Sequence, residues 1–146
     1  MAAFSDYLKT AVLNHIFRQT AYVQPTNISI ALTTAESEDT QDGSTISEVP
    51  TTIDGNPTGY VRINLGAPDD GVWEFSAVEL GLLLNSSQMI FDAALVDWGA
   101  ISGVAILDSS DHGTGNLLMH ATLENARLIY SGDRVRFDST DLEVSI

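Results

Sequence analysis

The oxygen-rich stretch from Asp108 to Asn116 contains the residue types in this chain that could bind a cation. It combines Asp108, Asp111 and Asn116 with glycines that permit a tight loop. Hard oxygen ligands of this kind are those that Ca²⁺ prefers, but the spacing and terminal glutamate of an EF-hand are absent. We therefore treat Asp108 and Asp111 as candidate metal ligands. The expectation for this stretch is a polar turn between two strands, without a bound metal.

No arrangement of nucleophile, base and metal ligands indicates an enzyme. The chain has no cysteine and lacks the G-x-S-x-G, P-loop and H-E-x-x-H motifs. Its three histidines, His15, His112 and His120, do not have the short spacing of a helix-borne metal pair. Carboxylates are so frequent that their closeness in sequence indicates nothing about acid–base chemistry. We predict a protein with no catalytic residues and no cofactor.

The charge excludes whole classes of partner. Six Lys and Arg residues against 20 Asp and Glu residues give a net charge of −14 at pH 7. A nucleic-acid-binding protein needs cations that displace the counterions of the phosphate backbone, and anionic membranes need them too. We therefore expect neither a nucleic acid nor a membrane as partner. The acidity either keeps the protein soluble at high local concentration or faces a basic partner surface or divalent cations.

The elements that must position these residues are mainly strands. A chain of 146 residues with 44% hydrophobic residues is sufficient for one domain, 1–146. After Pro25, apolar residues alternate with small or polar ones, as in the stretch from Ile28 to Thr33. Similar strands separated by Gly-, Pro- and Asp-rich turns are predicted at Tyr60–Leu65, Val72–Phe75, Met89–Phe91, Ile101–Leu107, Leu117–Leu123, Arg134–Phe137 and Leu142–Ile146. The pattern predicts a mainly β fold, a β-sandwich or barrel-like single domain with its β-core over about residues 26–146. Glu79–Leu84 fits a short helix or a buried strand.

One amphipathic helix is predicted at the N-terminus, over about residues 5–19. Ser5 is suited to cap the helix, and Asp6 in the first turn suits the helix dipole. Apolar residues recur at helical spacing, namely Phe4, Leu8, Ala11, Val12 and Ile16. We expect this face to pack on the chain's own domain, with docking on a neighbouring subunit as the alternative. In the second case Phe4, Leu8 and Val12 are candidate assembly residues.

The acidic segment, residues 35–58, fits a compact domain poorly. It contains little apolar sequence, and a loop this long without regular structure is uncommon inside a domain. Ile46 and Val49 are expected at most to form a short edge strand. We predict an exposed arm that a neighbouring subunit orders, so that deleting residues 36–54 leaves the β-core folded. The candidate interface residues on the arm are Glu36, Glu38, Asp39, Asp42 and Glu48.

A series of short motifs runs along nearly the whole chain: Phe4–Leu8, Leu13–Arg18, Thr20–Tyr22, Pro25–Thr26, Ile30–Thr34, Gly59–Arg62, Trp98–Ile101, Gly103–Asp108, Gly115–Leu118 and Ser131–Asp133. In this order they resemble a family of small virion proteins of tailed bacteriophages, described as tail fibre or minor structural proteins. Trp98 also reads as a core anchor beside a bend at Gly99. The resemblance implies a structural role without activity or cofactor. The partners it implies are other phage structural proteins, either the major capsid protein or tail proteins, in a virion assembled in the host cytoplasm.

Two positions on the particle fit this resemblance. The first is that of a capsid decoration (cement) protein bound outside the shell. The second is that of a tail fibre or tail-appendage module that contacts the host receptor. The chain lacks the heptads and repeats of a fibre shaft and ends with its last strand, which favours the decoration protein. We expect a homo-oligomer, with a trimer favoured because it suits the local threefold axes of a capsid.

Overall fold

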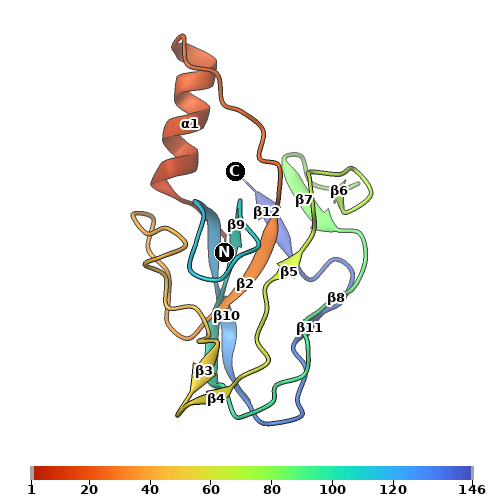
Figure 1. The fold of residues 1–146 in the computed structure, drawn as a ribbon. Coiled ribbons are helices and arrows are strands. Elements are labelled where there is room, and N and C mark those ends of the chain that lie inside the picture. Colours follow the sequence, from red (N-terminus) through yellow and green to blue (C-terminus); the bar gives the residue numbers. More distant parts are fainter. Residues whose placement is uncertain (1, 146) are drawn as a thin grey trace.

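Antiparallel strands make up most of the regular secondary structure in this computed structural model, which describes residues 2–145 (Figure 1). Its one helix, α1, covers Asp6–Phe17. The strands are β1 Ala3–Phe4, β2 Ser29–Thr33, β3 Thr52–Ile53, β4 Asn56–Pro57, β5 Ile63–Asn64, β6 Trp73–Phe75, β7 Leu82–Asn85, β8 Met89–Ile90, β9 Gly99–Leu107, β10 Leu117–Ile129, β11 Arg136–Phe137 and β12 Glu143–Ser145. The predicted mainly β fold with an N-terminal helix is therefore confirmed.

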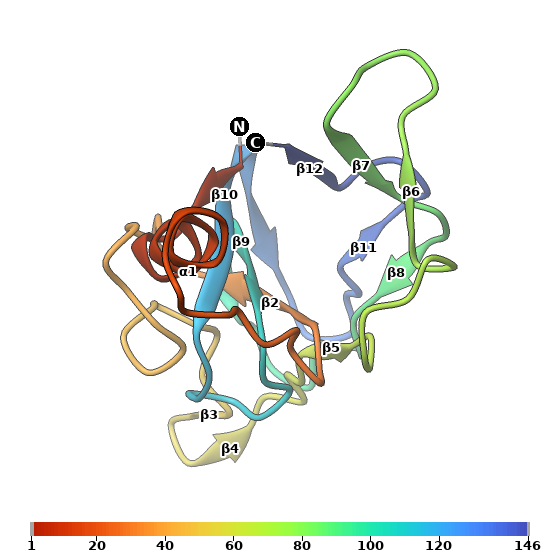
Figure 2. The same cartoon turned by 90° about the horizontal axis from the view of Figure 1, so that it is seen from above.

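The strands of the described residues form one larger sheet and three small ones. The larger sheet has the order β1-β10-β9-β2-β5, and the others are β12-β7-β6, β11-β8 and β3-β4. Figure 2 shows the large sheet on one side of the molecule and β7, β8, β11 and β12 on the other, around a common centre. The arrangement resembles an incomplete barrel, because the ladders of the described residues do not join the separate sheets.

A cluster of aromatic and aliphatic side chains fills this centre, and Trp98 is held in it by a hydrogen bond and an aromatic contact. The indole N–H of Trp98 donates to the Thr58 carbonyl at 2.9 Å, and the ring meets Tyr60 edge-on at 5.6 Å. The next residue, Gly99, has a φ of 80°, in the left-handed region that favours glycine. The expected core anchor beside a glycine bend is therefore confirmed. The other buried members are Ile30, Leu32, Val49, Met89, Phe91, Ala94, Ile101, Val104, Ile129 and Leu142.

Strand β2 is buried on both faces, whereas its alternation predicted one buried face. All five of its residues are buried. Ile30 and Leu32 point into the main cluster, while Ala31 lies in a second cluster with Ile46, Ala105, Leu107 and Leu117. Ile46 belongs to the acidic segment. The second face is therefore covered by the segment that the sequence predicted to be an exposed arm.

The prediction of an exposed arm is wrong for the part of the acidic segment that lies on β2. Val49 is fully buried, and its N–H donates to the Leu32 carbonyl at 3.1 Å. Ile46 and Val49 form no edge strand; Glu48 instead makes an isolated β-bridge with Thr33. The short hairpin β3–β4 follows. Two apolar anchors and backbone hydrogen bonds to β2 are thus enough to order a segment that is otherwise polar.

Several predicted strands differ in extent from the observed ones. In Tyr60–Leu65 only β5 is paired as a strand. Strand β10 continues past Leu123 to Ile129, because a bulge between Thr122 and Arg127 restores its pairing with β9. Glu79–Leu84 becomes a turn followed by β7. The last strand is β12, and Ile146 lies outside the described residues.

Helix α1 projects from one end of the molecule instead of packing along its length (Figure 1). None of its residues is buried. Phe4, predicted on the helix face, lies in β1, whereas Leu8 and Val12 are half-buried. The predicted packing is wrong for Ile16, which is 61% exposed, because the sheet reaches only the first turns of the helix. Within residues 2–145 no helix is long and apolar enough to cross a membrane.

Candidate functional site

The base of α1 is fixed to strand β10 by Ser5. The Ser5 hydroxyl oxygen accepts from the backbone N–H of Leu8 at 3.1 Å, as predicted for the helix cap. The same hydroxyl donates to the Leu117 carbonyl, and the Ser5 N–H donates to the Leu118 carbonyl at 3.0 Å. Ser5 is fully buried. Ser5, the residue that caps the helix, therefore fixes where the helix leaves β10.

Asp39 of the acidic segment supplies a second attachment for the helix base. Its carboxylate forms an ion pair with Lys9 and accepts from Nε2 of His120 at 2.8 Å. Its carbonyl accepts from the N–H of Asp6 at 2.8 Å. The hydrogen bond from Lys9, together with that from His120, holds the pKa of Asp39 below its ordinary value. Asp39 was predicted to contact a neighbouring subunit, and the structure brings it together with α1 of its own chain.

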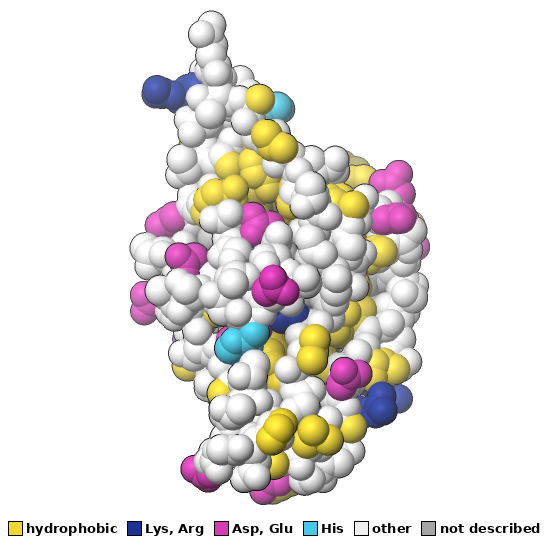
Figure 3. Space-filling model, viewed as in Figure 1, with side chains coloured by type: hydrophobic (Ala, Val, Ile, Leu, Met, Phe, Trp, Pro, Cys, Tyr) yellow, Lys and Arg dark blue, Asp and Glu magenta, His cyan; other side chains and the backbone are white. Residues whose placement is uncertain are grey.

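The outer end of α1 and the segment after it expose large apolar side chains. The exposed fractions are 57% for Leu13, 76% for Phe17 and 81% for Val23. Figure 3 shows apolar side chains exposed along this projecting part of the molecule. The chain folds back on the helix because the N–H of Tyr22 donates to Nδ1 of His15 at 3.1 Å. We call Leu13, Ile16 and Phe17, which lie within about one turn of each other on α1, the helix-tip patch.

The charge of the helix region differs in sign from that of the rest of the chain. Residues 5–24 contain one acidic residue, Asp6, and two basic residues, Lys9 and Arg18, for a net charge of +1. The whole chain carries −14, so the remaining residues carry −15. The helix-tip patch therefore lies on the part of the molecule that an acidic surface repels least.

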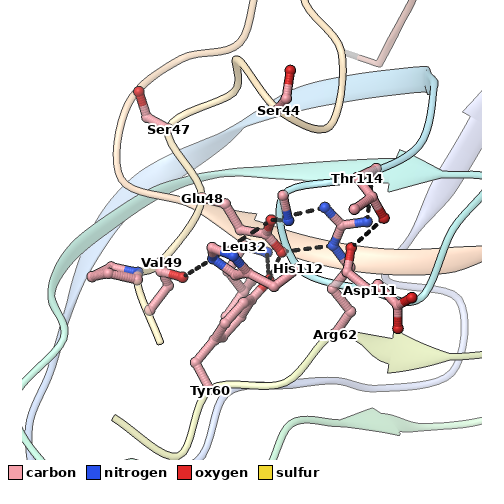
Figure 4. A network of polar contacts seen from close by, with 12 residues as sticks. Leu32, Ser44, Ser47, Glu48, Val49, Tyr60, Arg62, Asp111, His112 and Thr114 are labelled. Carbon is pink, nitrogen blue, oxygen red and sulfur yellow. Dashed lines mark hydrogen bonds and ion pairs between the residues drawn. The ribbon is translucent and has the colours of Figure 1, made fainter. Parts of the chain in front are cut away.

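The acidic segment is fastened to the core by a buried ion pair between Glu48 and Arg62 (Figure 4). Their side chains are 3% and 0% exposed. Arg62 donates from Nε to Glu48 Oε1 at 2.7 Å and from Nη2 to Oε2 at 2.8 Å, a bidentate geometry. Its Nη1 also donates to the carbonyls of Ser109 and Thr114, at 2.8 and 2.9 Å. One guanidinium thus joins the acidic segment to the loop that precedes β10.

Tyr60 and the loop after β9 complete the coordination of the Glu48 carboxylate. The Tyr60 hydroxyl donates to Oε1 at 2.8 Å, and the Gly113 N–H donates to Oε2 at 3.2 Å. Burial opposes ionisation of Glu48, but hydrogen bonds from Arg62 and Tyr60 outweigh it, so the pKa of Glu48 lies below its ordinary value. Burial, and then the Glu48 charge, raise the pKa of Tyr60. Glu48, Arg62 and Tyr60 thus hold one another in place. Their role is structural, because they fasten the acidic segment to the core.

The remaining candidate interface residues of the acidic segment do not converge with Glu48. Glu36, Glu38 and Asp42 are exposed. Asp42 caps its own turn, because its Oδ1 accepts from the N–H and the hydroxyl of Ser44 at 2.8 and 2.7 Å. The hydroxyl and then the N–H of Ser44 lower the pKa of Asp42. Glu36 and Glu38 are thus the two exposed candidates here whose side chains form no hydrogen bond or ion pair with the residues that the structure describes.

The candidate cation loop is organised by its own hydrogen bonds. Asp108 accepts from the N–H of Asn116 at 2.6 Å and from its side-chain amide at 2.8 Å. Asp111 is exposed. Among residues 2–145, no group of three or more His, Cys, Asp and Glu side chains is arranged to hold a metal. The polar turn that we expected between two strands is therefore observed between β9 and β10.

Two features of this site were not predicted from the sequence. The importance of Arg62 could have been inferred from its spacing, because Tyr60 and Arg62 lie two apart and share one face of an extended chain. The helix-tip patch could not have been inferred in this way. Leu13 and Phe17 lie off the face that the spacing identified, and nothing local indicates where the sheet ends.

A known protein family matches almost the whole of the chain. Residues 3–145 match a family described as Podophage GP4 fiber I protein gp80. No protein with a curated description matches the chain. The matched range includes α1, the acidic segment and every strand of the five-stranded sheet. The resemblance to phage fibre and structural proteins, inferred from the sequence motifs, is therefore confirmed.

Proposed function

Because the chain belongs to the phage fibre family described as Podophage GP4 fiber I protein gp80, we propose that it is a fibre module on the tail of a phage particle, attached through helix α1. The family is one of structural virion proteins. Its description names a fibre, which supports the tail position over the capsid decoration role that the sequence analysis favoured. Contact with other virion proteins follows from this role.

The observation that carries the attachment proposal is the helix-tip patch. Ile16 and Phe17 are 61% and 76% exposed at the end of a helix whose base is rigidly held by Ser5 and Asp39. Exposed apolar surface is favourable to remove from water, by about 25 cal/mol per Å². A projecting, anchored helix presents this surface away from the acidic body. Phe17 and Ile16 are therefore better suited to an intersubunit contact than the half-buried Leu8 and Val12.

The partner we propose for the patch is a second copy of this chain. The helix region carries +1 and the rest of the chain −15, so a helix tip meets another copy's body with favourable charge. Such a contact joins two different surfaces and closes into a ring only at a suitable rotation. A trimer is the closed ring that we propose, formed by helix-to-body contacts and no longer tied to the threefold axes of a capsid. We propose that Glu36 and Glu38 lie at the acidic rim of this contact.

The tail position is tested on intact particles. Antibody against the purified chain, followed by gold labelling and electron microscopy, is expected to mark the tail. Label over the shell lattice would instead establish the decoration role and overturn the proposal.

The attachment surface is tested with the purified chain in sedimentation velocity over a concentration series. We expect the wild-type chain to associate and the variant I16S/F17S to remain monomeric. The matched control is V61S, which removes a valine that is 57% exposed on the body of the molecule. Association that persists unchanged in I16S/F17S, or that V61S abolishes equally, contradicts the role of the helix tip.

A further inference from the structure

A groove of about 680 Å³ lies between the second half of β10 and the segment around β11. Three arginines line it, Arg127, Arg134 and Arg136, and they are half of the six Lys and Arg residues of the chain. We call this the arginine groove. Cationic side chains are rare in this acidic protein, and their gathering in one groove suggests that they bind a ligand.

The groove is built by an irregularity in the longest strand. Thr122 pairs with Gly103 and Arg127 pairs with Ile101, so that Ser102 alone lies opposite residues 123–126. A bulge of this kind bends a strand and re-aims its side chains. Leu123, Glu124 and Asn125 of the bulge, and Arg127 after it, line the groove. The register of the sheet thus creates the cavity and places Arg127 at it.

Two of the three arginines are without an ion pair among residues 2–145. Arg136 Nε lies 3.4 Å from Oδ1 of the exposed Asp138. Arg127 and Arg134 are exposed and form no such pair with the described carboxylates. Arginine offers a planar fork of donors that fits a carboxylate or a phosphate in bidentate fashion. The two unpaired forks can therefore receive an oxyanion from a ligand.

The groove is also lined by acidic and apolar side chains, which restrict the kind of ligand that can bind there. Its lining includes four carboxylates, those of Glu124, Asp133, Asp138 and Asp141. Three of these also accept hydrogen bonds within the chain: Asp133 from the Tyr130 N–H, Asp138 from the Gln88 amide and Asp141 from the Asp138 N–H. The apolar part of the lining consists of Ile101, Leu123, Leu128, Ile129, Val135 and Phe137. The carboxylates and the chain's charge of −14 disfavour a polyanion such as a nucleic acid.

We propose that the arginine groove binds a short acidic saccharide, a sugar chain that carries a carboxylate or a phosphate. Its oxyanion pairs with Arg127 and Arg134, and its hydroxyl groups donate to the carboxylates of the rim. The C–H face of a sugar ring lies against Phe137 and Val135. A neutral sugar leaves both arginines unpaired, and the volume lies in the usual range of small-ligand sites. The inference deepens the proposed fibre function and rests on it only for where such a saccharide is met.

The test is isothermal titration calorimetry with the full chain and three probes. Trigalacturonic acid supplies the carboxylate, mannose 6-phosphate supplies the phosphate, and maltotriose is the neutral comparison. We expect saturable binding of at least one acidic probe, with the better one identifying the oxyanion, and at least about tenfold weaker binding of maltotriose. Absence of binding by both acidic probes, or equal binding of maltotriose, overturns the proposal.

Matched variants locate the site. R127Q/R134Q is expected to weaken the acidic probe at least about tenfold, whereas R18Q, which removes an exposed arginine on the helix, leaves the affinity unchanged. Equal weakening by R18Q means long-range charge attraction and overturns a specific groove. If R127Q/R134Q abolishes self-association in sedimentation and leaves saccharide affinity unchanged, the groove is a subunit contact and the proposal is wrong. Gold labelling of the tail is independent of all these results, so failure here leaves the fibre function standing.

Discussion

The acidic segment is largely polar and helix α1 is amphipathic, yet the first is tied to the core and the second extends from it. The acidic segment has Glu48 in a buried ion pair and Val49 in the main cluster, with Ile46 in the second cluster. Helix α1 is fastened to the body at its base, by Ser5 and through Asp39. Whether a segment packs on the core therefore depends on a few fully buried contacts and not on the average polarity of the segment.

The largest effect is expected from removing the acidic segment. Replacing residues 36–54 with a short Gly–Ser linker uncovers Ala31, Leu107 and Leu117 and leaves Arg62 buried without its carboxylate. A buried charge that has lost its partner costs several kcal/mol, a large part of the total stability of a small domain. We expect no cooperative urea transition by circular dichroism. A native-like urea transition would contradict this prediction. It would support the expectation from the sequence that the β-core folds without the segment.

A suitable control for that deletion lies in the loop between β6 and β7. Residues 77–80 are exposed, and Val78 and Leu80 lie outside the two core clusters. Their removal shortens the chain without uncovering a buried face. We expect this variant to unfold cooperatively, so that loss of the transition is specific to the acidic segment.

The single substitution R62A is expected to have the next largest effect. It leaves the Glu48 carboxylate buried without its bidentate partner and frees the carbonyls of Ser109 and Thr114. Breaking a buried pair in this way destabilises by about 3–5 kcal/mol. The control R136A breaks an exposed pair with Asp138 and is expected to change the free energy of unfolding by less than about 1 kcal/mol. Equal changes in urea denaturation would show that the fastening contributes no more than a surface contact.

A smaller and pH-dependent effect is expected from E48Q. The folded pKa of Glu48 is lowered from an ordinary value of 4.5, so its charge stabilises the fold fully above about pH 4.5. That contribution is lost as the pH falls through the lower, folded pKa. The difference in free energy of unfolding between wild type and E48Q should therefore shrink on acidification. The same difference for the exposed-site variant E36Q should be small throughout, and a constant gap for E48Q would refute a titrating Glu48.

The sequence predicted the parts of this molecule that depend on local chemistry. The Ser5 cap, the alternation of β2 and the Trp98–Gly99 pair each express their structure within a few residues. The parts that it did not predict depend on where distant segments meet. Arg62 has a partner 14 residues earlier, and the second buried face of β2 exists only because the acidic segment returns over it. Helical spacing likewise identified an apolar face without indicating that the sheet supports only its first turns.

Substitution at the helix tip is expected to have the smallest effect on stability. It is nevertheless expected to abolish association of the chains. Ile16 and Phe17 are mostly exposed, so I16S/F17S removes almost no burial from the isolated chain. Exposed substitutions usually change the free energy of unfolding by less than about 0.5 kcal/mol each. The fully buried control L32A should lose about 2–5 kcal/mol in the same urea titration. A chain that keeps its stability but no longer associates has lost an intersubunit surface. A chain that loses both would show that the helix tip packs on its own domain, and the contrast between the two regions would disappear.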